Sequence, residues 1–183
     1  MHTPATADGC RKVNLFQGDY YVTRDPNVVV TTILGSCVAA CIRDPEAGVG
    51  GINHFLLPGN IDDPKSPRSD FVGVHLMELL INGLLREGAR RSSLEAKLFG
   101  GGRTVDGLSD IGSMNAAFAM RFLEAEGIAI KRGSLGGGQG RRIQFWPVSG
   151  RVRQSLISPA EARDRPFQPS VAIRPNAGDV DLF

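Results

Sequence analysis

The stretch from residue 28 to residue 42 decides the fold, and it reads Val28-Val29-Val30-Thr31-Thr32-Ile33-Leu34-Gly35-Ser36-Cys37-Val38-Ala39-Ala40-Cys41-Ile42. The first half, up to Leu34, is rich in β-branched residues, which is typical of a buried strand. Gly35-Ser36 then interrupts the apolar pattern, and a second apolar run begins at Val38. Because glycine and serine favour turns, the sequence predicts two strands with Cys37 at the junction between them.

A third strand is predicted over residues 49–57, after the turn Asp44-Pro45-Glu46-Ala47-Gly48. Proline presets φ at the first corner of such a turn, and Gly48 can take the left-handed conformation that closes it. The strands on either side of this turn are therefore expected to form a hairpin.

The hairpin is expected to place His54 on the same face of the sheet as Cys37. With a four-residue loop, Cys37 faces Leu56 and His54 is its diagonal neighbour, whereas with a two-residue loop Cys37 faces His54 directly. Only a loop of odd length or a bulge would put the two side chains on opposite faces. The sequence thus predicts a thiol and an imidazole as cross-strand neighbours.

Two helices separate these early strands from a later group. An apolar stripe spaced as on one helix face predicts the first helix, which Gly88 would end; its members are Met77, Leu80, Ile81, Leu84 and Leu85. The second helix is predicted from about Ser113 to Glu126. Further strands are predicted over residues 94–99, 128–131, 142–145 and 151–154. This order indicates an α+β fold with a mixed, largely antiparallel sheet and two main helices.

The chain has 183 residues, 42% of them hydrophobic, and a net charge of +2. Its size fits one domain, predicted over residues 13–155, between a disordered tail at 1–12 and a poorly ordered, proline-punctuated tail at 156–183. The weak charge gives no reason to expect a nucleic-acid partner. The first residues lack the apolar region of a secretory signal, and no apolar run reaches the roughly 18 residues of a membrane span. Neither export nor membrane insertion is expected.

The three cysteines are an odd number and come without a secretory signal, which argues against a disulfide framework and for a reduced, cytoplasmic setting. Cys10 falls in the predicted tail, and Cys41 is expected to be a core residue. Cys37 and Cys41 would lie about 13 Å apart along a strand, too far to share a metal ion. Cys37 is the candidate nucleophile, with backbone N–H groups near Ser36 and Cys37 available to an oxyanion.

An imidazole beside a thiol is the arrangement that yields a thiolate near neutral pH. His54 is predicted to supply it, because His2 is terminal and His75 falls on the polar face of its helix. A third group should orient the ring, and either Thr31 or Thr32 could accept its second N–H. The glycine runs at 100–102 and 136–140 fit no phosphate-binding motif and predict tight turns or close backbone approach.

Two segments together resemble the signature of the chemoreceptor glutamine deamidases (CheD); they read Thr31-Thr32-Ile33-Leu34-Gly35-Ser36-Cys37-Val38-Ala39-Ala40-Cys41 and Gly51-Ile52-Asn53-His54-Phe55-Leu56-Leu57-Pro58. The resemblance continues through residues 18–22, 95–102 and 140–143 and covers about residues 13–154. The chain departs from common family residues at four positions that bear on substrate or partner preference, His75, Ser113, Met114 and Ser134.

By position, the catalytic cysteine, histidine and threonine of that family match Cys37, His54 and Thr31. The resemblance implies a layered α/β sandwich that deamidates glutamines of methyl-accepting chemotaxis receptors to glutamate and hydrolyses receptor glutamate methyl esters. It implies no metal or organic cofactor, and some members pair with a chemotaxis phosphatase. The rival hypothesis is a non-enzymatic binding module that regulates such a phosphatase. A cysteine peptidase is a weaker alternative, because no extended substrate-binding segment is recognised.

Overall fold

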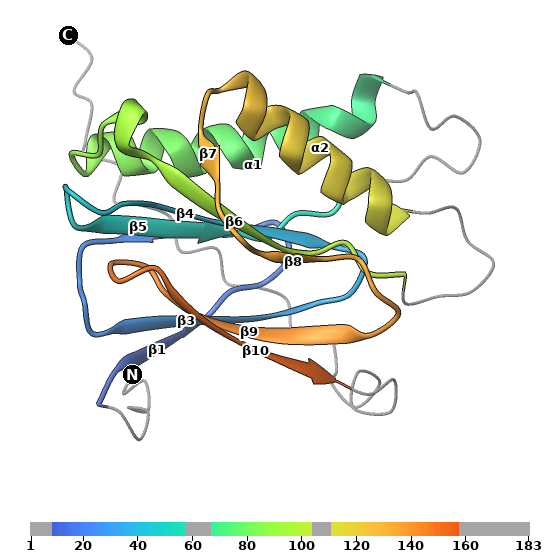
Figure 1. Cartoon of the computed structure of the whole chain (residues 1–183), viewed down its shortest axis with the longest axis horizontal. Helices are drawn as coiled ribbons and strands as arrows, with labels where there is room; N and C mark the ends of the chain where they lie inside the picture. Colours follow the sequence, from blue (N-terminus) through green and yellow to red (C-terminus); the bar gives the residue numbers. More distant parts are fainter. Residues whose placement is uncertain (1–8, 58–66, 104–110, 158–183) are drawn as a thin grey trace, which may run out of the picture.

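The structure, a computed structural model, describes residues 9–57, 67–103 and 111–157. Its strands form two stacked sheets, and two helices cover the outer face of one of them (Figure 1). The first sheet has the order β1-β3-β9-β10, with β1 (Arg11–Asn14), β3 (Val28–Leu34), β9 (Gly140–Trp146) and β10 (Arg151–Ile157). The second has the order β2-β5-β4-β6-β7, with β2 (Tyr20–Thr23), β5 (Val49–Asn53), β4 (Val38–Asp44), β6 (Glu95–Gly100) and β7 (Ala129–Ile130), and β8 (Ser134–Leu135) also pairs with β6.

The strands pair mostly antiparallel, and the β1–β3, β6–β7 and β6–β8 pairs are parallel. The helices are α1 (Pro67–Arg86) and α2 (Ile111–Ala125), and a short 3-10 helix, η1 (Arg91–Ser93), precedes β6. The predicted α+β class, with mixed, largely antiparallel pairing and two main helices in a layered arrangement, is confirmed.

Two apolar layers hold the sheets and helices together. One lies between the helices and the second sheet, and it contains the predicted stripe of α1, of which Met77, Leu80, Ile81 and Leu84 are fully buried. The other lies between the two sheets and contains Val30, Leu34, Ala39, Cys41, Ile52, Ile143 and Phe145. Gly88, with φ +92°, donates its N–H to Leu85 O just after α1 ends, so the predicted glycine stop is confirmed.

The β4–β5 hairpin has the register that a four-residue loop requires. Asp44 lies opposite Val49, and the pairing continues to a bridge between Val38 and Phe55. The Asp44 carboxylate accepts two loop N–H groups, at 2.9 and 3.0 Å, and Gly48 closes the loop with φ +64°. Of the two registers considered, the one that makes His54 the diagonal neighbour of Cys37 is therefore confirmed.

Three short strands, β1, β2 and β8, have no counterpart among the predicted ones. β1 and β2 are edge strands of four residues, and β8 has two residues, so none shows the apolar run that marks a central strand. β1 begins at Arg11, inside the tail predicted over residues 1–12, and β10 reaches Ile157, past the predicted domain end at residue 155. Residues 1–8 and 158–183 of the predicted tails lie outside the described residues.

Candidate active site

Cys37 lies on the crossover that carries the chain from β3 in one sheet to β4 in the other. The glycine run at 100–102 packs against this crossover, and Gly101 N–H donates to Cys37 O at 2.8 Å. A β-carbon on Gly100 would come within 2.0 Å of Cys37 O, and this glycine has φ +110°, so no other residue fits without strain. The predicted close backbone approach at this glycine run is confirmed.

Asn115 of α2 ties the crossover to the segment that follows His54. Its side chain is fully buried, its Nδ2 donates to Ser36 O at 3.1 Å, and its Oδ1 accepts the N–H of Leu57 at 2.8 Å. This residue belongs to the framework of the site, and no role was predicted for it. The signal in the sequence is an asparagine on the buried face of an amphipathic helix, because a buried amide needs hydrogen-bond partners.

Cys37 and His54 both face the layer between the two sheets. Cys37 is half-buried and packs against the apolar cluster there, and the hairpin register puts His54 on the same face. The imidazole is buried, and its Nδ1 lies 2.9 Å from Thr32 Oγ1. Its Nε2 has no hydrogen-bond partner among the described residues. Since Nδ1 contacts Thr32, Nε2 is the ring nitrogen left to exchange a proton.

The hydrogen bond to the imidazole comes from Thr32, whereas the resemblance assigns the catalytic threonine to Thr31. Thr32 lies opposite Ile143 of the inter-sheet layer, so its side chain points toward the second sheet and His54. Side chains alternate along a strand, so Thr31 points to the other face of β3. Its Oγ1 is buried without a hydrogen-bond partner among the described residues. In the structure, the hydrogen bond that orients His54 therefore involves Thr32, one residue after the position that the resemblance assigns.

Burial keeps both members of the dyad neutral. The pKa of the Cys37 thiol is raised by desolvation, which outweighs the lowering effect of backbone hydrogen bonds from Cys37 and Gly35. Desolvation lowers the pKa of His54 to about 4. The sequence predicts a depressed pKa for this thiol, since an imidazole beside a thiol yields a thiolate near neutral pH. The structure gives the opposite direction, because burial disfavours both charges.

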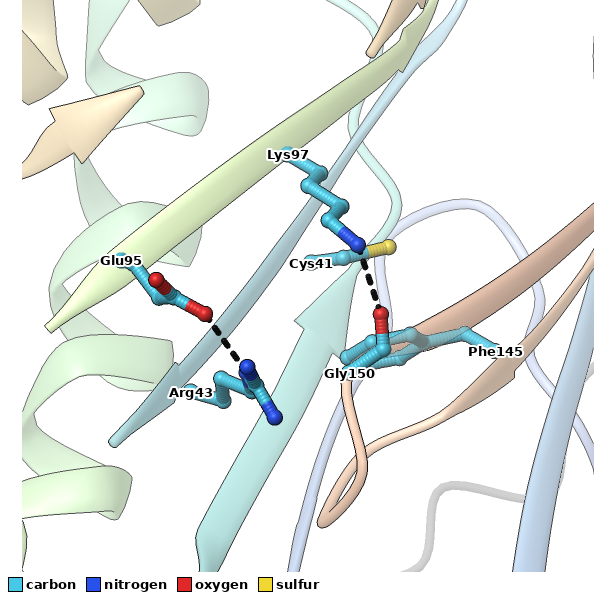
Figure 2. Close-up of a pocket in the computed structure, with 6 residues that line it drawn as sticks. All are labelled: Cys41, Arg43, Glu95, Lys97, Phe145 and Gly150. Atoms are coloured by element: carbon cyan, nitrogen blue, oxygen red, sulfur yellow. Dashed lines mark hydrogen bonds and ion pairs between the residues drawn. The ribbon is translucent and has the colours of Figure 1, made fainter. Parts of the chain in front are cut away.

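A second thiol, Cys41, lies farther along β4 and lines a small pocket between the sheets (Figure 2). The charged side chains around it have partners: Arg43 Nε lies 2.7 Å from Glu95 Oε1, and Lys97 Nζ donates to the backbone oxygen of Gly150 at 2.8 Å. Burial raises the pKa of Cys41 far above its usual range. Cys41 is therefore a core thiol without a base. Among the described residues, no cluster of His, Cys, Asp or Glu could hold a metal ion.

We expect His54 to make the fold less stable as the pH falls from about 6.5 to about 4. Its folded-state pKa of about 4 lies below the ordinary value, so in this window the unfolded chain binds a proton that the folded protein does not. The free energy of unfolding falls by up to about 3 kcal/mol as the pH approaches about 4. Denaturant unfolding of the wild type and of His54→Gln gives the free energy of unfolding of each at every pH in this range. The contribution of His54 is the difference between these two free energies. A difference that does not change with pH would contradict the lowered pKa.

The comparisons with known proteins point to one family. The family described as CheD chemotactic sensory transduction matches residues 56–155. The chain is 57% identical to a protein of Caulobacter sp. (strain K31), over 94% of this chain and 93% of the relative. It is 54% identical to one of Agrobacterium fabrum, over 94% and 97%, and 56% identical to one of Caulobacter vibrioides, over 94% and 93%. Each of these relatives is named "Probable chemoreceptor glutamine deamidase CheD".

Among solved structures, a Neisseria meningitidis protein aligns with a TM-score of 0.43 and 13% identity, over 72% of this chain and 64% of that chain. Similarity at this level supports no inference about function. Neither helix in the described part of the chain is long and apolar enough to cross a membrane.

Proposed function

The chain belongs to the CheD family, and we propose that it is a cysteine hydrolase that deamidates glutamine side chains of methyl-accepting chemotaxis receptors to glutamate. The observation that carries the proposal is the unpartnered, buried Nε2 of His54 on the sheet face it shares with Cys37. The substrate class follows from the names of the relatives. The reaction takes place in the cytoplasm, where the signalling domains of such receptors lie.

The neutral dyad favours general-base catalysis over a preformed ion pair. His54 acts as the base in the tautomer in which Nδ1–H donates to Thr32 Oγ1 and Nε2 carries the lone pair. As Cys37 Sγ attacks the carboxamide carbon of the substrate, its proton passes to Nε2. The positive charge then develops on the imidazole only as negative charge develops on the substrate oxygen. Backbone N–H groups at Ser36 and Cys37 hold that oxyanion.

The remaining steps use the same groups. Imidazolium gives its proton to the departing nitrogen, ammonia leaves, and a thioester joins Cys37 to the substrate side chain. His54 then takes a proton from a water molecule that attacks the thioester carbon, and collapse releases glutamate and the thiol. A receptor glutamate methyl ester enters the same sequence with methanol as the leaving group. Both reactions use the side chains and backbone N–H groups named above, with water as the only co-reactant.

The alternative function is a binding module that regulates a chemotaxis phosphatase. A binding surface alone would have no use for a buried imidazole, oriented by Thr32, on the sheet face that it shares with a thiol, so the geometry favours the enzyme. Intact-mass analysis of a co-expressed receptor cytoplasmic domain distinguishes the two, because each deamidated glutamine adds about 1 Da. A receptor domain with unchanged mass, together with tight binding of a phosphatase, would favour the binding module.

We expect Thr32→Ala to lower kcat for receptor deamidation roughly tenfold, the cost of one hydrogen bond that orients the base. Thr31→Ala is the matched control on the opposite face of β3, with an expected loss within about threefold. Thr32→Ser should restore most of the rate, because it keeps the hydroxyl. If Thr31→Ala were the more damaging change, the assignment by resemblance would be right and the contact with Thr32 incidental.

A further inference from the structure

We propose that Gln17 stands in for the substrate: its carboxamide fills the subsite in which a receptor glutamine is attacked, and the substrate displaces it. The inference rests on the proposed function. Its starting point is a direct contact, in which Cys37 Sγ donates to Gln17 Oε1 at 3.4 Å. Gln17 carries the same primary carboxamide as the glutamine side chain that the reaction consumes. The nucleophile therefore already meets the functional group of its substrate.

The backbone around Gln17 is fixed to both sides of the site. Leu15 N–H donates to Thr31 O at 2.9 Å, which attaches the segment to the first sheet. Gly18 N–H donates to His54 O at 2.7 Å, which attaches it to the second. The segment between β1 and β2 thus bridges the two sheets beside the dyad, and it holds residue 17 at the thiol. The backbone position of residue 17 is therefore set by hydrogen bonds to both sheets.

The side chain itself can leave at little cost. Gln17 is exposed, and Cys37 is only half-buried, so their contact lies at the solvent side of the site. A thiol is a weak hydrogen-bond donor, so a small free energy holds the carboxamide in place. Leu15, in contrast, is buried and anchors the segment. A substrate carboxamide can therefore replace Gln17 while the backbone stays where it is.

The geometry also explains why Gln17 can occupy the subsite without being consumed. The thiol keeps its proton and directs it to the carboxamide oxygen, whereas attack requires a deprotonated sulfur that approaches the carboxamide carbon. Gln17 therefore acts as an internal competitor. It raises the apparent KM for the receptor and shields Cys37 from small electrophiles, each by about two- to fivefold, as expected for one weak hydrogen bond.

Two substitutions at this position should act in opposite directions. Gln17→Ala opens the subsite, so alkylation of Cys37 by iodoacetamide should be about two- to fivefold faster, and KM should fall by a similar factor without a loss of kcat. Gln17→Glu places a carboxylate against the thiol; it accepts a stronger hydrogen bond and disfavours the thiolate, so alkylation should slow and KM should rise. Gln154→Ala, at an exposed glutamine on β10, is the matched control.

The experiment follows Cys37 alkylation by peptide mass spectrometry, with the buried Cys41 as internal reference, and measures KM and kcat on a receptor cytoplasmic domain. Opposite shifts for Gln17→Ala and Gln17→Glu, with Gln154→Ala unchanged, support the proposal. Shifts in the same direction, or none, overturn it, and so does a Cys37-dependent gain of about 1 Da at Gln17, which would make this residue a substrate. Failure of the proposed function would appear separately, as a receptor that no variant modifies while the alkylation rates still diverge.

Discussion

Replacing Cys37 with serine should lower the rate of receptor deamidation by at least about a thousandfold, which is the typical loss when a covalent nucleophile is removed. A serine hydroxyl is far less acidic than a thiol, and the dyad offers it a base whose pKa is only about 4. Such a base cannot activate a hydroxyl group well. The loss should appear in kcat, measured from the mass gain of a receptor cytoplasmic domain over time.

Cys41→Ala is the matched control, since it removes the other thiol of the same strand. Cys41 has no base beside it and lines the pocket shown in Figure 2, so its replacement should cost stability and not activity. The lost packing of a buried cysteine is expected to cost about 1 kcal/mol in the free energy of unfolding. If folded Cys41→Ala were inactive while Cys37→Ser kept its rate, the assignment of the nucleophile would be wrong.

Replacing His54 with glutamine should lower kcat by at least about a hundredfold, because a general base typically contributes that much or more. Glutamine fills similar space and can still bond to Thr32, so the fold should survive, with a melting temperature near that of the wild type. In the wild type, the lowered pKa predicts that kcat/KM stays level from neutral pH downward and falls only as the pH approaches about 4.

That pH profile distinguishes a buried neutral dyad from a dyad whose histidine has an unshifted pKa. A histidine with an unshifted pKa would cause the rate to fall already near pH 6.5. A descending limb near that value, or a His54→Gln variant with wild-type kcat, would show that the imidazole does not act as described.

The shared face of Cys37 and His54 could be predicted from the sequence because strand side chains repeat every two residues. Both loop lengths considered for the Asp44–Gly48 turn keep Cys37 and His54 on the same face of the sheet, so the prediction did not depend on choosing between them. The apolar spacing of α1 and the glycine after it were equally local signals. Each of these features depends on residues that are close along the chain.

The contacts that complete the site depend on how the two sheets stack, and the sequence carries no local signal for this. Thr31 and Thr32 are adjacent and chemically identical, and only the placement of β3 opposite the second sheet selects Thr32 for His54. Gln17 and Asn115 reach the crossover from distant segments, so their roles appear only in three dimensions. The pKa directions of the dyad follow from burial, which again is a property of the fold.

The central claim is that Cys37 forms a thioester with a receptor glutamine, and acid quenching of a single turnover tests it most directly. Acid quenching stops thioester hydrolysis by His54, so the intermediate present during wild-type turnover is trapped. Intact-mass analysis is then expected to show a covalent species equal to enzyme plus receptor domain minus ammonia, about 17 Da, which hydroxylamine releases and Cys37→Ser lacks. Deamidation of the receptor domain by Cys37→Ser at the wild-type rate, with no such species in any variant, would contradict the claim.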